Sequence, residues 1–281
     1  MGEPTLLCYN FHMGDYIAKL SGDYISVDKS YGGSQIWFRD GEKGNLSRDN
    51  IIKGYGCGLI GASDILMYIG AVKKPAREKI GIGKRTDELG DVHTQSMTTA
   101  EYKSYIHRME KLYFHIYPKL GMSGIMLMLG MNLYLLMHGR EIKRETGRRF
   151  RARWGVRPTR IYESIEKMLA EEIPVIIAIG PGYFSKRRLR LYGVKPAATK
   201  AHYVTVTGIR RMKREHTSVE LRGPARLRRK LWHSLYRDDD IYLEVSSWGR
   251  RYCISWNEYI DYVLQCDNFL FSNILYIGAK S

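Results

Sequence analysis

The chain has 281 residues, of which 44% are hydrophobic and 26% charged, a composition typical of a folded globular protein and unlike that of a disordered chain. The formal net charge is +16, and the longest apolar run, 125–137, is shorter than the roughly 18 residues that a membrane-spanning helix needs. The N-terminus lacks a basic segment followed by an apolar stretch, so we expect no signal peptide. The four cysteines are scattered, which favours a reduced, cytoplasmic setting over a disulfide framework.

The positive charge is concentrated in one stretch of the chain. Residues 139–237 hold 26 Lys and Arg against 8 Asp and Glu, whereas the rest of the chain holds 19 against 21. This asymmetry indicates an anionic partner, such as nucleic acid, a membrane surface or an acidic protein, although a solvated basic surface explains it equally well. Arginine binds phosphates and carboxylates in a bidentate manner, so the expected anion-binding residues are Arg148, Arg149, Arg151, Arg187, Arg188, Arg228 and Arg229.

The first half of the chain has mainly helical periodicity. Taken in chain order, the pattern predicts a strand at 34–38, a polar loop at 39–50, a buried helix from Leu59 to Ile69, a charged loop at 71–97 and a helix at 97–114 with a threonine cap. It then predicts a core helix at 121–139, a basic connector at 139–157 and a helix at 160–172 capped by Thr159.

The second half has mainly strand patterns. We expect a buried strand at 173–180, a basic loop at 186–200, an alternating strand at 201–209, a basic insertion at 210–240, strands at 241–249 and from 251, a helix at 255–265 and a closing strand at 268–278. Because helices come first and strands follow, the order favours an α+β fold over an alternating α/β fold. We expect one domain over residues 1–281.

Cys57 is the candidate nucleophile. It precedes the predicted helix at Leu59 and lies between Gly56 and Gly58, which leave a thiol uncovered and let a substrate backbone approach. The partial positive charge of a helix N-terminus favours the thiolate, so we expect a lowered pKa at this position.

His202 is the candidate general base, because histidine is the side chain that exchanges protons near neutral pH. It opens the alternating strand at 201–209, where a rigid scaffold can aim it, and it shares a face with Val204 and Val206. The chain has seven other histidines, and they lie in polar loops, near helix patterns or near the N-terminus.

Three segments, GYGCGLIGASDILMYI, AHYVTVTGI and LEVSSWGRRYCI, together resemble the papain-like cysteine peptidases over residues 50–277. The segment MLAEEIPVIIAIG resembles the branch that cleaves bacteriocin leaders after a double glycine. The resemblance implies a helical half at 50–170, with the Cys helix packed on an antiparallel sheet at 171–277. It also implies a Cys57–His202 pair that cleaves a peptide or isopeptide bond.

The chain departs from the family pattern at two positions. Ser246 stands where the family has Asn or Asp, and a hydroxyl stabilises an imidazolium less than a carboxylate does. Glu244, on the same strand face, is a second candidate for orienting the imidazole. Ile51 stands where the family has the Gln of the oxyanion hole, so Asn50 or Gln35 would have to supply that amide.

Three hypotheses remain open. The first is a thiol hydrolase, the second an acyl transferase on the same scaffold, and the third a non-catalytic module that binds nucleic acid or an acidic protein through its basic face. We expect no cofactor and no metal, because a zinc site at Cys8 and His12 would need two further ligands that no usual spacing provides.

Overall fold

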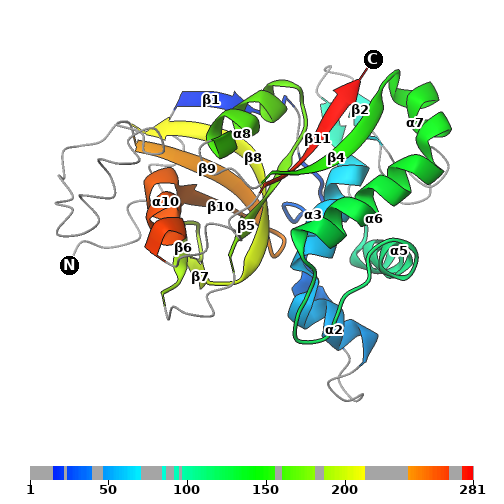
Figure 1. Cartoon of the computed structure of the whole chain (residues 1–281), viewed down its shortest axis with the longest axis horizontal. Coiled ribbons are helices and arrows are strands. Elements are labelled where there is room, and N and C mark those ends of the chain that lie inside the picture. The colour runs from blue at the N-terminus through cyan, green and yellow to red at the C-terminus, as the bar shows by residue number, and fades with distance from the viewer. Residues whose placement is uncertain are drawn as a thin grey trace.

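The computed structural model describes residues 15–21, 24–39, 47–70, 84–86, 92–94, 97–155, 160–180, 187–212, 240–265 and 274–280. These residues form an α+β fold, as predicted, in which helices lie on both faces of an antiparallel sheet (Figure 1). Within the described part of the chain, no helix combines the length and apolarity needed to cross a membrane.

The sheet has seven strands and contains both ends of the described chain. Its strands are β1 (Asp15–Lys19), β4 (Arg149–Gly155), β5 (Val175–Ile179), β8 (His202–Met212), β9 (Asp240–Ser247), β10 (Arg250–Ser255) and β11 (Ile274–Lys280). They are ordered β10-β9-β8-β5-β11-β4, and β1 pairs with the second half of β8. All five residues of β5 are buried, which confirms the prediction of a buried strand there.

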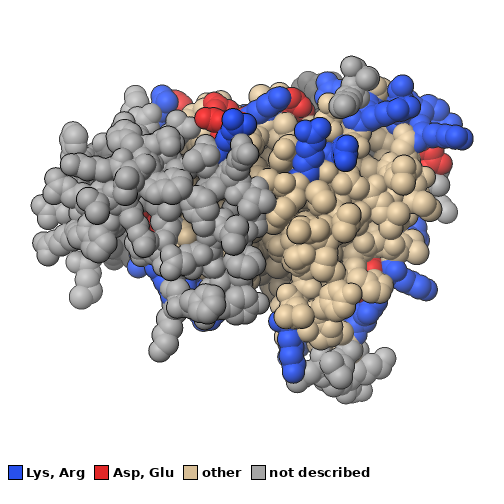
Figure 2. Space-filling model, viewed as in Figure 1, with Lys and Arg blue, Asp and Glu red and all other residues tan. Residues whose placement is uncertain are grey.

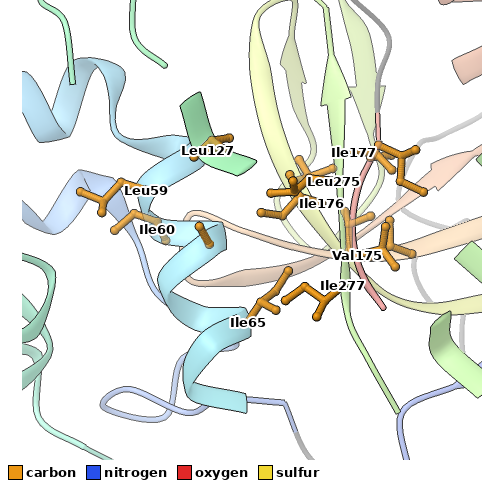
Figure 3. Close-up of a cluster of buried hydrophobic side chains, with 14 of the residues drawn as sticks. Leu59, Ile60, Ile65, Leu127, Val175, Ile176, Ile177, Leu275 and Ile277 are labelled. Atoms are coloured by element: carbon orange, nitrogen blue, oxygen red, sulfur yellow. The ribbon is translucent and has the colours of Figure 1, made fainter. Parts of the chain in front are cut away.

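One face of the sheet is covered by the helices of the first half. The helices that contact the sheet are α3 (Cys57–Tyr68) and α6 (Gly124–Met137), and α7 (Gly139–Thr146) contacts β4. Farther from the sheet, α5 (Thr99–Leu112) packs on α3, and α2 (Arg48–Tyr55) packs on the short helix at Gln35–Trp37. In Figure 3, Ile176 of β5 and Leu275 of β11 point toward α3, and Ile65 of α3 lies close to Ile277. This contact buries the side of α3 that faces the sheet, and the residues from Gly58 to Met67 are buried all around the helix.

The opposite face of the sheet is covered by α8 (Ile161–Ala170) and α10 (Trp256–Gln265). Tyr162 of α8 meets Trp256 of α10 with ring centroids 5.3 Å apart, so the two helices pack on each other as well as on the sheet. Tyr259 donates a hydrogen bond to the carbonyl of Ala178 at 3.1 Å, which ties α10 to β5.

Short elements complete the described structure, and all three differ from the sequence predictions. They are the 3₁₀ helix η2 (Gln35–Trp37) and two hairpins, β2 (Lys84–Thr86) with β3 (Val92–Thr94) and β6 (Leu189–Leu191) with β7 (Ala197–Thr199). The strand predicted at 34–38 is wrong, because the Ser34 hydroxyl accepts from the Ile36 N–H and closes a local turn. The predicted loop at 71–97 contains the β2–β3 hairpin, and the predicted loop at 186–200 contains the β6–β7 hairpin.

The predicted basic connector at 139–157 is also wrong, since it forms α7 and β4. Phe150, Ala152 and Trp154 alternate with arginines along β4, which is the period of a strand with one face on the core. The charge of the segment obscured this period. Thr159, the predicted cap of α8, lies outside the described residues.

Several helix starts follow the sequence closely. The Thr98 hydroxyl accepts from the Glu101 N–H while the Glu101 carboxylate accepts from the Thr98 N–H, so α5 begins with a complete capping box. α3 begins at Cys57 itself, and Gly56 occupies the cap position without a side-chain hydrogen bond.

Alanine substitutions at two glycines test how tightly the structure is packed near α3. A Cβ at Gly33 would overlap the Tyr102 hydroxyl, whereas a Cβ at Gly54, inside α2, would meet nothing within 4 Å. We expect Gly33→Ala to lower the free energy of unfolding by about 1–3 kcal/mol through overpacking. Gly54→Ala should raise it by up to about 1 kcal/mol, because alanine favours a helix interior. Urea denaturation measures both, and equal effects of the two substitutions would contradict this packing.

Candidate active site

A pocket lies where the start of α3 meets the end of β9 and the start of β8. Its lining includes Gln35, Cys57, Asp64, His202, Ser246 and Ser247. Four of the residues predicted from the sequence therefore line one pocket, although Cys57 and His202 lie far apart in the chain.

Cys57 is the first residue of α3, and its thiol lies beside the start of β8. The backbone of Tyr203, the residue after His202, lies close enough to the sulfur to lower the pKa of the Cys57 thiol. The side chain is partly exposed. Burial of the sulfur raises the pKa of the Cys57 thiol above its ordinary value, and this outweighs the hydrogen bonds that lower it. The lowered pKa expected from the helix N-terminus is therefore wrong.

His202 opens β8, as predicted, and its imidazole is held on two sides. Its Nε2 lies 2.6 Å from the Ser247 hydroxyl oxygen. Its ring is stacked on the Trp248 indole, with centroids 4.3 Å apart and planes 17° from parallel. The residue is buried, and this burial lowers the pKa of His202 to about 3. The imidazole is therefore neutral at physiological pH.

A tight turn places Trp248 over the imidazole. Arg250 pairs with Ser247 across β9 and β10, so the hairpin loop consists of two residues, Trp248 and Gly249. Both have positive φ, 50° and 71°, as a type I′ turn requires. A bulky residue rarely adopts this conformation, which identifies Trp248 as a strained residue at the pocket.

Ser246 does not orient the imidazole, which corrects the sequence-based assignment. Thr205 pairs with Ser246 across β8 and β9, so these two residues share one face of the sheet. Ser247 and His202 lie on the other face because side chains alternate along a strand. The Ser246 hydroxyl instead donates to the Tyr31 carbonyl at 2.8 Å.

Glu244, the second candidate, is also bound elsewhere. Its carboxylate accepts from the Arg210 guanidinium at 3.1 Å and from the Tyr31 hydroxyl at 3.2 Å. This buried ion pair lies next to the Tyr16 hydroxyl, which donates to the same carboxylate at 3.0 Å. Glu244 therefore belongs to a structural cluster that links β1, β8 and β9.

Gln35 and Asn50 are the two sequence-based candidates for the side-chain amide that donates to an oxyanion. Of the two, Gln35 lines the pocket with Cys57. Its side-chain amide donates to the Lys53 carbonyl at 3.0 Å, which anchors η2 on α2. An amide nitrogen carries a second hydrogen, so it retains a donor. Asn50 lies in α2 and is not among the residues that line the pocket.

Asp64 is a buried acid in the pocket that the sequence analysis missed. It lies two turns after Cys57 on α3, and its carboxylate accepts from the Tyr102 hydroxyl at 2.6 Å and from the Gly33 N–H at 2.8 Å. Burial raises the pKa of Asp64 to about 7, against the opposing effect of these hydrogen bonds. The one feature of the sequence that pointed to Asp64 is its position as a single acidic residue in an otherwise uncharged, largely apolar helix.

The predicted anion-binding arginines do not form one described surface. Arg148, Arg149 and Arg151 are exposed at or near β4, at one end of the strand order, whereas Arg187 and Arg188 are exposed before β6, which packs near β10 and α10 at the other end (Figure 1). Arg228 and Arg229 lie outside the described residues, as do Cys8 and His12.

Comparisons with known proteins give no family for this chain. A scan against protein-family models and searches of curated proteins and of solved structures each found no match. Within the described ranges, no group of three or more His, Cys, Asp and Glu side chains is placed to hold a metal ion.

His202 and Asp64 should give the free energy of unfolding opposite dependences on pH. A histidine whose pKa falls from 6.5 to about 3 on folding loses stability as pH falls through this window. An aspartate whose pKa rises from 3.8 to about 7 loses stability as pH rises through its own window. Between about pH 4 and 6.5 the two effects, each about 1.4 kcal/mol per pH unit, offset one another.

Substituting either residue should therefore expose the effect of the other. Relative to wild type, the stability of Asp64→Asn should increase with pH between about pH 4 and 6.5, and that of His202→Gln should decrease, each by about 1.4 kcal/mol per unit. Urea denaturation over this pH range measures both slopes. Parallel curves for the two variants and wild type would show that neither group has a shifted pKa.

Proposed function

We propose that this protein is a thiol hydrolase of the papain-like kind, in which Cys57 attacks a peptide or isopeptide carbonyl and His202 acts as the base. The observation that carries the proposal is that Cys57 and His202 line one pocket, with the imidazole held by Ser247 and stacked on Trp248. A nucleophile, a base and an orienting group in one pocket are the elements that nucleophilic catalysis requires.

The contact between Nε2 and the Ser247 hydroxyl supports one distribution of roles between the two ring nitrogens of His202. If Nε2 carries the proton and donates to the Ser247 hydroxyl, Nδ1 is the atom left to accept the thiol proton of Cys57. The sulfur then bonds to the substrate carbonyl carbon, and the Cys57 N–H and the Gln35 amide stabilise the oxyanion. The amine leaves with the proton from Nδ1, and a water activated by His202 hydrolyses the thioester.

Burial favours the neutral thiol of Cys57 and the neutral imidazole of His202. A raised thiol pKa and a lowered imidazole pKa both oppose a preformed thiolate–imidazolium pair. In the proposed mechanism the proton moves as the sulfur attacks, and Ser247 supplies a hydroxyl where a carboxamide or carboxylate would stabilise the imidazolium more strongly. We therefore expect a slow enzyme.

A library of fluorogenic tetrapeptides tests the hydrolase directly. Hydrolysis should be lost in Cys57→Ala and His202→Gln, because each removes a reacting group. It should persist in Cys253→Ala, the matched control, since Cys253 is buried in β10 and does not line the pocket. Hydrolysis that persists in Cys57→Ala, or the absence of any hydrolysis by wild type, would contradict the proposal. Added amine tests the transferase alternative, because transfer would give the amide product at the expense of the acid.

The pH dependence of Cys57 alkylation tests whether Cys57 and His202 start as a neutral thiol and a neutral imidazole. Because burial raises the pKa of the Cys57 thiol above 9.0, its alkylation by iodoacetamide should rise only above about pH 9. His202→Gln should leave this profile unchanged, since desolvation and not the imidazole controls the thiolate. Mass spectrometry of the peptide that contains Cys57 follows the reaction. A plateau of reactivity near pH 6 that His202→Gln removes would instead show a preformed ion pair.

A further inference from the structure

The outer side of α6 is apolar where a helix on the surface of a globular protein is normally polar. The sequence predicts a core helix at 121–139, but only one side of α6 is buried. Five large side chains on the other side are 45% to 79% exposed, and we call them the α6 stripe: Ile125, Leu129, Leu133, Leu136 and Met137. Their spacing places them along one side of the helix.

The α6 stripe forms a continuous uncharged surface. In Figure 2, a broad area without charged residues covers the region of α6, and Lys and Arg side chains lie along its upper border. Asn132 is the polar residue within this stretch of α6, and its amide is bound to the backbone N–H and carbonyl of Ala152 in β4. An apolar area of this kind with a charged border marks an interaction site.

The border of the stripe is strongly basic. α7 follows α6 directly, and β4 packs beside α6. Residues 139–155, which include α7 and β4, hold seven Lys and Arg against two Glu. Those in α7 are Arg140, Lys143 and Arg144, all exposed, and Arg149, Arg151 and Arg153 are exposed along β4. An uncharged stripe with a cationic border is complementary to a partner that combines an apolar layer with negative charge.

We propose that the α6 stripe and its basic border bind the surface of a lipid bilayer that contains anionic headgroups. The stripe would lie at the boundary between headgroups and acyl chains while the arginines and lysines bind the headgroup phosphates and carboxylates. The stripe consists of aliphatic and thioether side chains, whereas protein interfaces depend on Trp, Tyr and Arg anchors in shaped pockets. A second copy of the chain is disfavoured, because it would bring two basic borders together.

Vesicle sedimentation tests this proposal with the full chain. Wild type should sediment with phosphatidylcholine vesicles that contain about one-third phosphatidylserine and remain in solution with pure phosphatidylcholine vesicles. Leu129→Gln/Leu133→Gln should weaken this binding about tenfold or more, because both side chains lose apolar contact with the bilayer. Arg151→Gln/Arg153→Gln should weaken it at low salt and have less effect at high salt.

Matched controls separate the stripe from general effects of substitution. Val194→Gln changes a side chain that is 93% exposed on the β6–β7 turn, and it should bind vesicles as wild type does. Lys195→Gln/Lys200→Gln removes the same charge as the β4 pair from exposed positions next to β7, outside the basic border, and should have a smaller effect. Because every substituted side chain is exposed, all variants should keep the far-ultraviolet spectrum and the urea midpoint of wild type.

Three results would overturn the proposal. The first is no sedimentation of wild type with anionic vesicles, and the second is equal binding by Leu129→Gln/Leu133→Gln. The third is a concentration-dependent dimer in analytical ultracentrifugation that the same double substitution abolishes, which would make the stripe a contact between copies of the chain. None of these measurements depends on Cys57, so they stand apart from the proposed hydrolase.

Discussion

The close approach of α3 to β8 and β5 is the contact on which the pocket depends. A Cβ at Gly58 would lie 2.8 Å from Leu127 and 3.2 Å from Tyr203, and a Cβ at Gly61 would lie 3.1 Å from Thr205. A larger residue at these positions would require Leu127 of α6 and the β8 residues Tyr203 and Thr205 to shift. Tyr203 and Thr205 line the pocket with Cys57, so such a shift would change the shape of the pocket.

The same contact determines the electrostatics of the pocket. Three titratable side chains, Cys57, Asp64 and His202, line the pocket, and for each of them burial is the first cause of the pKa shift. Burial disfavours whichever form is charged, so it raises the pKa of the two acids and lowers that of the base. The result is a nearly neutral site inside a strongly basic protein. A reaction at this site would start from neutral groups and would generate charged groups as it proceeds.

Much of the fold could be predicted from the sequence because it follows local patterns. The continuous apolar run of β5, the alternation in β8 and the cap of α5 each determine their element through nearby residues. β4 was missed although it also alternates, since its exposed face consists of arginines that suggested a connector. The outer side of α6 was wrongly predicted to be buried. An apolar residue suggests burial, and the sequence does not show which sides of a helix its neighbours cover.

The site could be predicted only in part. Cys57 and His202 were identified from a helix start and a strand start, which are visible in the sequence. The choice between Ser246 and Ser247 depends on the register of β8 against β9, and a shift of one residue exchanges the two faces. Asp64 meets its two partners, Tyr102 and Gly33, through contacts between distant segments. No spacing in the sequence specifies such contacts.

The position of β11 has a consequence for how the chain reaches its folded state. This strand, at residues 274–280, is inserted between β5 and β4 and pairs with both. During synthesis, β4 and β5 are made long before the strand that joins them, so each leaves an unpaired edge beside exposed apolar side chains. Closure of the sheet must wait until the ribosome has delivered β11. Until then, the unpaired edges of β4 and β5 favour aggregation of the nascent protein.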